Sequence, residues 1–144
     1  MGYPRNEEEV EIINKQIEKH PIDTITPVIR ADEIESLQKE ITRIHMDDSL
    51  KDYIVEIVSR TREHKGVYLG ASPRGSLALF KTSKAFAALN GREFVFPDDI
   101  KALSVSVLTH RLILKPEARI KGVTPDKIIK EVVESVAVPT VEGI

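Results

Sequence analysis

The 144-residue sequence contains no cysteine and no tryptophan, and only 5% of its residues are aromatic. Without cysteine there can be no disulfide framework, thiolate metal site or cysteine nucleophile. No apolar run approaches the roughly 20 residues that cross a bilayer, and no charged-then-apolar leader precedes the first predicted helix. We therefore expect a cytoplasmic protein without a membrane span.

An excess of charge of one sign is also lacking, because 21 basic and 23 acidic side chains give a formal net charge of -2. No global field is available to attract nucleic acid or anionic lipid. A DNA-binding domain with Arg60, Arg62, Lys65 and Arg74 on phosphates is an alternative that this balance disfavours. Its signature would be a steep loss of binding with added salt. We expect no nucleic-acid partner.

Leucine, isoleucine, valine and alanine supply most of the apolar residues, which recur at spacings of three and four. This is the period of an amphipathic helix that buries one face. The clearest stripe consists of Leu50, Tyr53, Ile54, Ile57 and Val58. The pattern predicts an all-α fold, a bundle of five or six helices with an N-terminal helical arm. The predicted helices cover about residues 6–20, 32–44, 47–65, 72–89, 98–108 and 125–138.

Acidic and polar residues mark the predicted helix starts. Asn6 with Glu9, and Asp32 with Glu35, each match the spacing of a capping box. Asp98 is the predicted cap of the fifth helix. We expect these side chains to accept hydrogen bonds from the free N–H groups of the first turns.

The predicted connecting segments divide the chain. Residues 21–30 lie between prolines and predict an extended connector, so we place an N-terminal arm at 1–30 and the helical domain at 31–144. Gly66 should close the third helix, residues 67–69 should form a short buried connector, and residues 112–122 should be irregular.

Several kinds of catalytic site are absent from the sequence. The phosphate loop G-x-x-x-x-G-K-[ST] is missing, as is an apolar strand ending in paired acids that could hold magnesium. Ser72 and Ser76 lack a G-x-S-x-G elbow. The four histidines have no metal-ligand spacing, so we expect no metal site; they are His20, His45, His64 and His110.

The segment from Gly70 to Ser76, Gly-Ala-Ser-Pro-Arg-Gly-Ser, carries the strongest functional signal. Ser72 and Pro73 predict a helix start, and Arg74 then projects from a first turn whose free N–H groups favour an anion. An arginine fork is suited to a phosphate oxygen. The plainer interpretation is an arginine in a surface ion pair beside an ordinary capped helix.

Read together, the dispersed motifs resemble the C-terminal lid of MoxR-family AAA+ ATPases. The resemblance covers about residues 47–140, and Gly2-Tyr3-Pro4 with Glu7 to Glu9 is similar to the stretch that follows the last core strand in that family. The matching residues are Thr61-Arg62, Gly70-Ala71-Ser72-Pro73-Arg74-Gly75, Ala85, Gly91-Arg92, Val95, Pro97-Asp98-Asp99-Ile100, Val107-Leu108 and His110-Arg111-Leu112.

The resemblance implies a role for each residue of this segment. Arg74 would be the sensor-two arginine, which contacts the γ-phosphate side of ATP and makes the lid respond to nucleotide state. Gly70, Ser72, Pro73 and Gly75 would lie near the nucleotide. Two further arginines, Arg62 and Arg111, would face the nucleotide or the interface with a neighbouring subunit, or serve the structure, and we favour the structural role.

The resemblance also implies cofactors and partners. ATP and Mg²⁺ would belong to the parent ATPase, with no cofactor in this chain. The partners would be its own AAA+ core domain and neighbouring subunits of a ring, and the work chaperone-like.

The sequence departs from the family before Gly2, where no strand, Walker motif, sensor-one residue or arginine finger stands. We therefore expect a lid separated from its ATPase core and not catalytic alone. The alternative is a stand-alone helical adaptor that binds other proteins, which leaves the Gly-Ala-Ser-Pro-Arg turn unexplained.

Overall fold

A computed structural model describes residues 2–17 and 20–140. The chain falls into two compact units, Met1–Ser36 and Leu37–Ile144, and the boundary lies within the helix α2 (Ala31–Arg43). The boundary predicted from the sequence, between residues 30 and 31, stands at the start of this helix.

The first unit contains α1 (Asn6–Asn14), the short 3-10 helix η1 (Pro21–Thr24) and the beginning of α2. The prediction of a helix over 6–20 is wrong at its end, and η1 replaces part of the predicted extended connector. No described residue of α1 is buried, and Val10 and Ile13 remain 56% and 62% exposed. Since tertiary packing supplies most helix stability, no packing contact within the described part of the chain supports a longer α1.

The predicted capping boxes of these helices are displaced by one or two residues. The backbone N–H of Arg5 donates to the Glu8 carboxylate over 2.8 Å, so the box is not Asn6 with Glu9. Before α2, the N–H of Arg30 donates to Glu33 over 2.8 Å, so the Asp32–Glu35 box is also wrong. Both stretches contain at least three acids within five residues, and the sequence pattern alone does not select the one that accepts the capping hydrogen bond.

The second unit is a helical bundle. It contains α3 (Asp48–Glu63), α4 (Pro73–Leu89), α5 (Pro97–Leu108), the short α6 (Pro116–Ile120) and α7 (Pro125–Ser135). α3 packs against α4 and α7, and α5 packs against the same two helices. Their apolar faces form a single core, and the all-α prediction is confirmed. The largest fully buried side chains include Leu50, Ile54, Ile57, Leu79, Ile100, Leu108, Ile128 and Ile129.

The helices of the bundle begin and end for local reasons. Proline stands at the start of α4, α5, α6 and α7, where its missing N–H costs nothing. Asp47 caps α3 by accepting a hydrogen bond from the N–H of Ser49 over 2.9 Å. Gly91, at φ 67°, ends α4 in the left-handed conformation that glycine favours.

Two predicted boundaries in the bundle are wrong. Phe96, not Asp98, occupies the N-cap of α5, and the cap acceptor is the carboxylate of Asp99. α3 ends at Glu63, and the N–H of Gly66 bonds the His64 ring over 3.1 Å, so Gly66 is not the closing residue.

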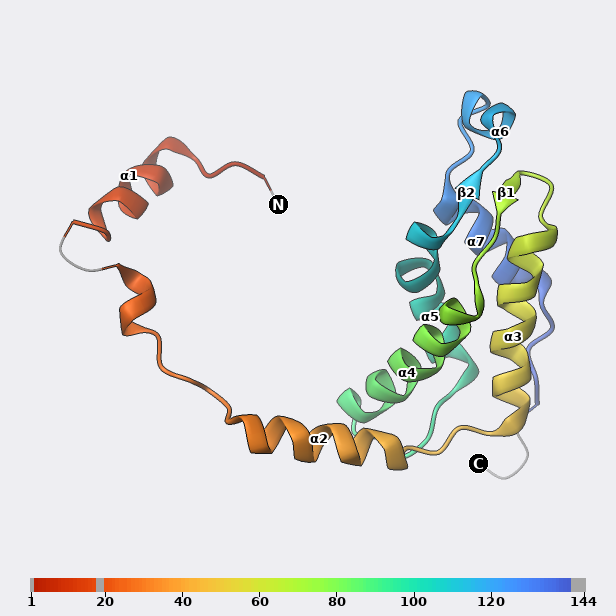
Figure 1. The fold of residues 1–144 in the computed structure, drawn as a ribbon, viewed down its shortest axis with the longest axis horizontal. Helices are drawn as coiled ribbons and strands as arrows, with labels where there is room; N and C mark the ends of the chain where they lie inside the picture. The colour runs from red at the N-terminus through yellow and green to blue at the C-terminus, as the bar shows by residue number, and fades with distance from the viewer. Residues whose placement is uncertain (1, 18–19, 141–144) are drawn as a thin grey trace. The chain divides into compact units, whose positions relative to one another are not determined.

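A two-stranded antiparallel sheet, β1 (Val67–Leu69) with β2 (Ile113–Leu114), lies at one end of the bundle with α6 (Figure 1). Val67 pairs with Leu114, and both are buried. The predicted buried connector is therefore a strand of which only Val67 is buried, and the segment 112–122, predicted to be irregular, contains β2 and α6. Within the described residues, no helix is long and apolar enough to cross a membrane.

Candidate functional site

Residues Gly70, Ala71 and Ser72 connect β1 to α4, and Pro73, Arg74 and Gly75 form the first turn of α4; we call this six-residue segment the Gly70–Gly75 turn. Ser72 occupies the N-cap of α4, as predicted, but its side chain makes no capping hydrogen bond. Pro73 opens the helix, and the N–H of Gly75 donates to the Ser72 carbonyl over 2.7 Å. Arg74 therefore lies in the first helical turn of α4, which has 17 residues.

Ala71, in the middle of the Gly70–Gly75 turn, is hydrogen-bonded to two residues in the last turn of the helix α3. The Ala71 N–H donates to the Thr61 hydroxyl oxygen over 3.0 Å, and that hydroxyl donates to the Val58 carbonyl over 2.6 Å. The Ala71 carbonyl accepts from Nε of Arg62 over 2.9 Å. Both backbone polar groups of Ala71 are therefore bound by adjacent residues of one helix.

Both glycines of the turn lie against neighbouring elements. A Cβ on Gly70 would stand 2.6 Å from the Arg62 Cα and 2.7 Å from its backbone nitrogen, which is closer than side-chain carbons approach. A Cβ on Gly75 would stand 3.1 Å from Leu108 and 3.7 Å from Cδ of Arg111. The turn is thus packed between α3 and the end of α5.

Arg74 is exposed, and its guanidinium has no hydrogen-bond or ion-pair partner among residues 2–17 and 20–140. The first turn of α4 contains no acidic residue that could neutralise it. A cation beside free helix N–H groups is unfavourable with respect to the helix dipole unless an anion is bound there. The surface ion pair that was the plainer interpretation of Arg74 is not formed in the described part of the chain.

The two other candidate arginines bind backbone carbonyls. Arg62 donates from Nε to Ala71, and Arg111 donates from Nε to the Val107 carbonyl over 2.9 Å. The structure therefore gathers the predicted site residues around one turn. These are Gly70, Ser72, Pro73, Arg74 and Gly75, with Arg62 on α3 and Arg111 beside Gly75.

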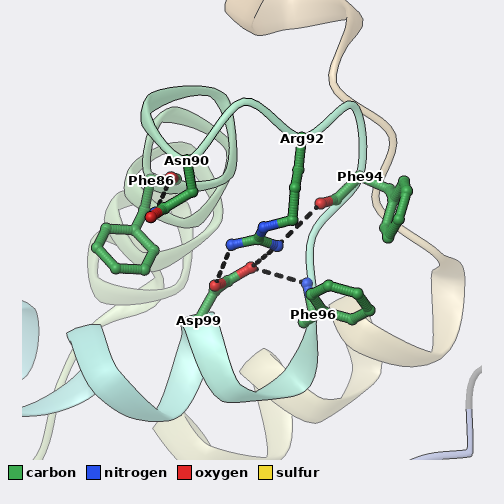
Figure 2. A network of polar contacts seen from close by, with 6 residues as sticks. All are labelled: Phe86, Asn90, Arg92, Phe94, Phe96 and Asp99. Atoms are coloured by element: carbon green, nitrogen blue, oxygen red, sulfur yellow. Dashed lines mark hydrogen bonds and ion pairs between the residues drawn. The ribbon is translucent and has the colours of Figure 1, made fainter.

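The structure also contains an ion pair that the sequence reasoning missed, between Arg92 and Asp99 (Figure 2). Nη1 and Nη2 of Arg92 donate to the two Asp99 oxygens over 2.8 and 2.7 Å. The guanidinium also lies 4.8 Å from the ring centroid of Phe96. The hydrogen bond with Asp99 raises the pKa of Arg92 above its already high value. The sequence feature that could have indicated this ion pair is the position of Arg92, directly after the Asn90-Gly91 turn and seven residues before Asp99 in the first turn of α5.

The histidines do not gather in the described part of the chain, where no three His, Cys, Asp or Glu side chains are placed to hold a metal ion. His64 lies with Nε2 3.4 Å from a Glu131 oxygen, linking the end of α3 to α7. His20 accepts a hydrogen bond from the N–H of Ile22 beside η1. These contacts explain two of the four histidines structurally.

The sequence matches the model of a known protein family over the part of the chain that contains this site. The model of the AAA lid domain matches residues 59–132, from the last turns of α3 into α7, and so includes the whole Gly70–Gly75 turn.

Several proteins are similar over more of the chain. Uncharacterized protein YeaC of Bacillus subtilis (strain 168) is 46% identical over 139 residues, covering 96% of this chain and 43% of that protein. Chaperone MoxR1 of Mycobacterium tuberculosis is 32% identical over 153 residues, covering 100% of this chain and 40% of that protein.

A solved structure is similar as well. The crystal structure of a predicted ATPase from Cytophaga hutchinsonii has a TM-score of 0.80 at 27% identity, covering 97% of this chain and 45% of that one. The chain thus spans less than half the length of these relatives. The resemblance to the lid of MoxR proteins is confirmed, and the chain belongs to the AAA lid domain family.

Proposed function

We propose that this chain is the lid of a MoxR-type AAA+ ATPase and that Arg74 is its sensor-two arginine. The observation that carries the proposal is an exposed arginine without a partner in the described residues, at the start of a long helix whose first turn has no acid. Such a site favours a phosphate oxygen, because the N–H groups and the guanidinium both attract negative charge.

The chain supplies only part of a nucleotide site. Its sequence has no phosphate loop and no strand with paired acids, so the β- and γ-phosphates and Mg²⁺ would be held by residues outside it. Arg74 would stabilise the negative charge that develops on the transferred phosphoryl group. The lid alone is therefore not expected to hydrolyse ATP.

The partners follow from the same proposal. The lid would contact its own AAA+ core domain and the adjacent subunits of a ring in the cytoplasm, and the full-length protein would share the chaperone function for which the Mycobacterium tuberculosis relative is named. Gly70, Ser72, Pro73 and Gly75 would be the residues nearest to the nucleotide.

The test is the steady-state ATPase activity of the full-length protein with Arg74→Ala. We expect kcat to fall on the order of a hundredfold with KM little changed, because the interaction is made chiefly with the developing charge. Arg60→Ala is the matched control, since Arg60 is exposed on α3 and pairs with Glu56 over 2.7 Å. Unchanged turnover in the Arg74→Ala protein would refute the sensor role.

The adaptor function remains the second candidate because the arm exposes apolar residues, among them Val10, Ile13 and Ile17. Sequencing the gene upstream in the same reading frame separates the two. A phosphate loop there supports the ATPase lid, and a stop codon directly upstream supports the adaptor.

A further inference from the structure

We propose that Thr61 and Arg62 are a positioning pair that sets the direction in which Arg74 meets a bound phosphate. The inference rests on the proposed function and adds to it the residues of α3 that orient the arginine. The last turn of α3 does not itself carry Arg74, but by orienting this arginine it would take part in the response of the lid to a bound nucleotide.

The first support is the hydrogen bonding of the turn. Arg74 stands three residues after Ala71, and both polar backbone groups of Ala71 are bound by Thr61 and Arg62. Thr61 is fully buried and its hydroxyl is itself oriented by the Val58 carbonyl. The two peptide units that meet at the Ala71 Cα are each held by one of these hydrogen bonds, which restricts φ and ψ of Ala71 and so fixes the direction of the backbone that leads to Arg74.

The second support is steric. Gly70 lies so close to the backbone of Arg62 that even a methyl group would not fit, and Gly75 lies against Leu108. The turn therefore cannot slide along α3, and a displacement of the α3 end must move the turn with it.

The third support is the contrast between two arginines of α3. Arg60 forms a pair with Glu56 four residues earlier on its own helix, which is the ordinary arrangement of a surface arginine. Arg62 instead donates from Nε to a carbonyl nine residues away. The Arg62 side chain therefore connects the helix α3 to the Gly70–Gly75 turn, which carries Arg74.

The experiment uses four variants with matched controls. Thr61→Val keeps the shape of the side chain and removes its hydroxyl, whereas Thr61→Ser keeps the hydroxyl. Arg62→Ala removes the Ala71 contact, whereas Arg60→Ala removes a neighbouring charge without touching the turn.

Amide hydrogen exchange in this chain is the first measurement. Thr61→Val removes the acceptor of the Ala71 N–H and should speed exchange there about tenfold, the factor expected for losing one such hydrogen bond. Both Thr61→Val and Arg62→Ala should also speed exchange at Gly75, because each loosens the turn that holds the Gly75 N–H on the Ser72 carbonyl. Core amides such as that of Leu79 should keep their rates, which shows that the bundle stays folded. Unchanged exchange at Ala71 and Gly75 would overturn the inference.

Turnover of the full-length protein is the second measurement. Thr61→Val and Arg62→Ala should lower kcat about tenfold with KM unchanged, Thr61→Ser should restore kcat, and neither change should lower kcat further in an Arg74→Ala background. An equal loss in that background would overturn the inference, because the pair would then act independently of Arg74.

The two proposals fail in different ways. Slow turnover in Arg74→Ala with normal turnover in Thr61→Val and Arg62→Ala would overturn only the positioning role. Full activity in Arg74→Ala would overturn the sensor role and the positioning role together.

Discussion

Replacing Asp99 by alanine should destabilise the bundle far more than any exposed acid of the same helix. Asp99 is 5% exposed, and its carboxylate accepts two hydrogen bonds from Arg92 and one from the Phe96 N–H (Figure 2). The variant leaves the backbone N–H of Phe96, the N-cap residue of α5, without its acceptor, which costs about 1 kcal/mol. It also leaves a guanidinium whose side chain is only 22% exposed without its counter-charge, which costs about 2 kcal/mol more.

The expected loss is therefore about 3 kcal/mol of unfolding free energy, at the lower end of what breaking a buried pair costs. With a urea dependence of about 1.5–2 kcal/mol per molar, the unfolding midpoint should fall by roughly 1.5–2 M. The assay is urea unfolding of the 144-residue chain followed by far-ultraviolet circular dichroism.

Asp98→Ala is the matched control. Its carboxylate is 87% exposed and, among the residues that the structure describes, pairs only with Lys101 over 3.1 Å, so the loss should stay within about 0.5 kcal/mol. Equal midpoints for the two variants would refute the reasoning, since they would show that the Arg92–Asp99 pair contributes no more than a surface pair. Because the cation of this pair has a raised pKa, its charge and its contribution persist to strongly alkaline pH.

Two further predictions concern single hydroxyl and carboxyl groups. Ser83 is fully buried and its hydroxyl has no hydrogen-bond partner in the described residues, so Ser83→Ala should raise the unfolding free energy by up to about 1 kcal/mol. Ser104→Ala loses a hydrogen bond to the Ile100 carbonyl and should not raise the unfolding free energy. Thermal unfolding of both variants checks this, and a destabilised Ser83→Ala protein would contradict it. The side-chain and backbone hydrogen bonds from Ser49 lower the pKa of Asp47 below its ordinary value of 3.8. The advantage of the wild type over Asp47→Ala should be complete above pH 3.8 and disappear as the pH falls through the lowered pKa, which acid titration of the unfolding midpoint measures.

Much of the bundle can be predicted from the sequence because its helices combine a strong apolar period with proline starts. Leu50, Ile54 and Ile57 fall on one face of α3, and that face is the one the structure buries. The Gly-Ala-Ser-Pro-Arg turn is equally local, so its place at the start of α4 follows from Ser72 and Pro73.

The errors occur where the outcome depends on contacts distant in sequence or on a choice among similar neighbours. Asp98 and Asp99 are equivalent as cap candidates, and only the approach of Arg92 and the Phe96 N–H selects Asp99. α6 has five residues, too few to show a helical period. The binding of Ala71 by Thr61 and Arg62 depends on how α3 meets the turn, which no local pattern encodes.

The prolines that open α4, α5, α6 and α7 have a consequence for how this domain tolerates changes in length. A proline disfavours helical geometry in the residue before it, so none of these helices can grow backward by absorbing part of the preceding loop. Residues added ahead of Pro125 would remain in the loop and leave the apolar face of α7 in register, whereas residues added directly ahead of Pro97 would separate the Phe96 N–H from the Asp99 carboxylate. The loop before Pro125 is therefore a place where an insertion can lengthen the chain without changing the packing of the core.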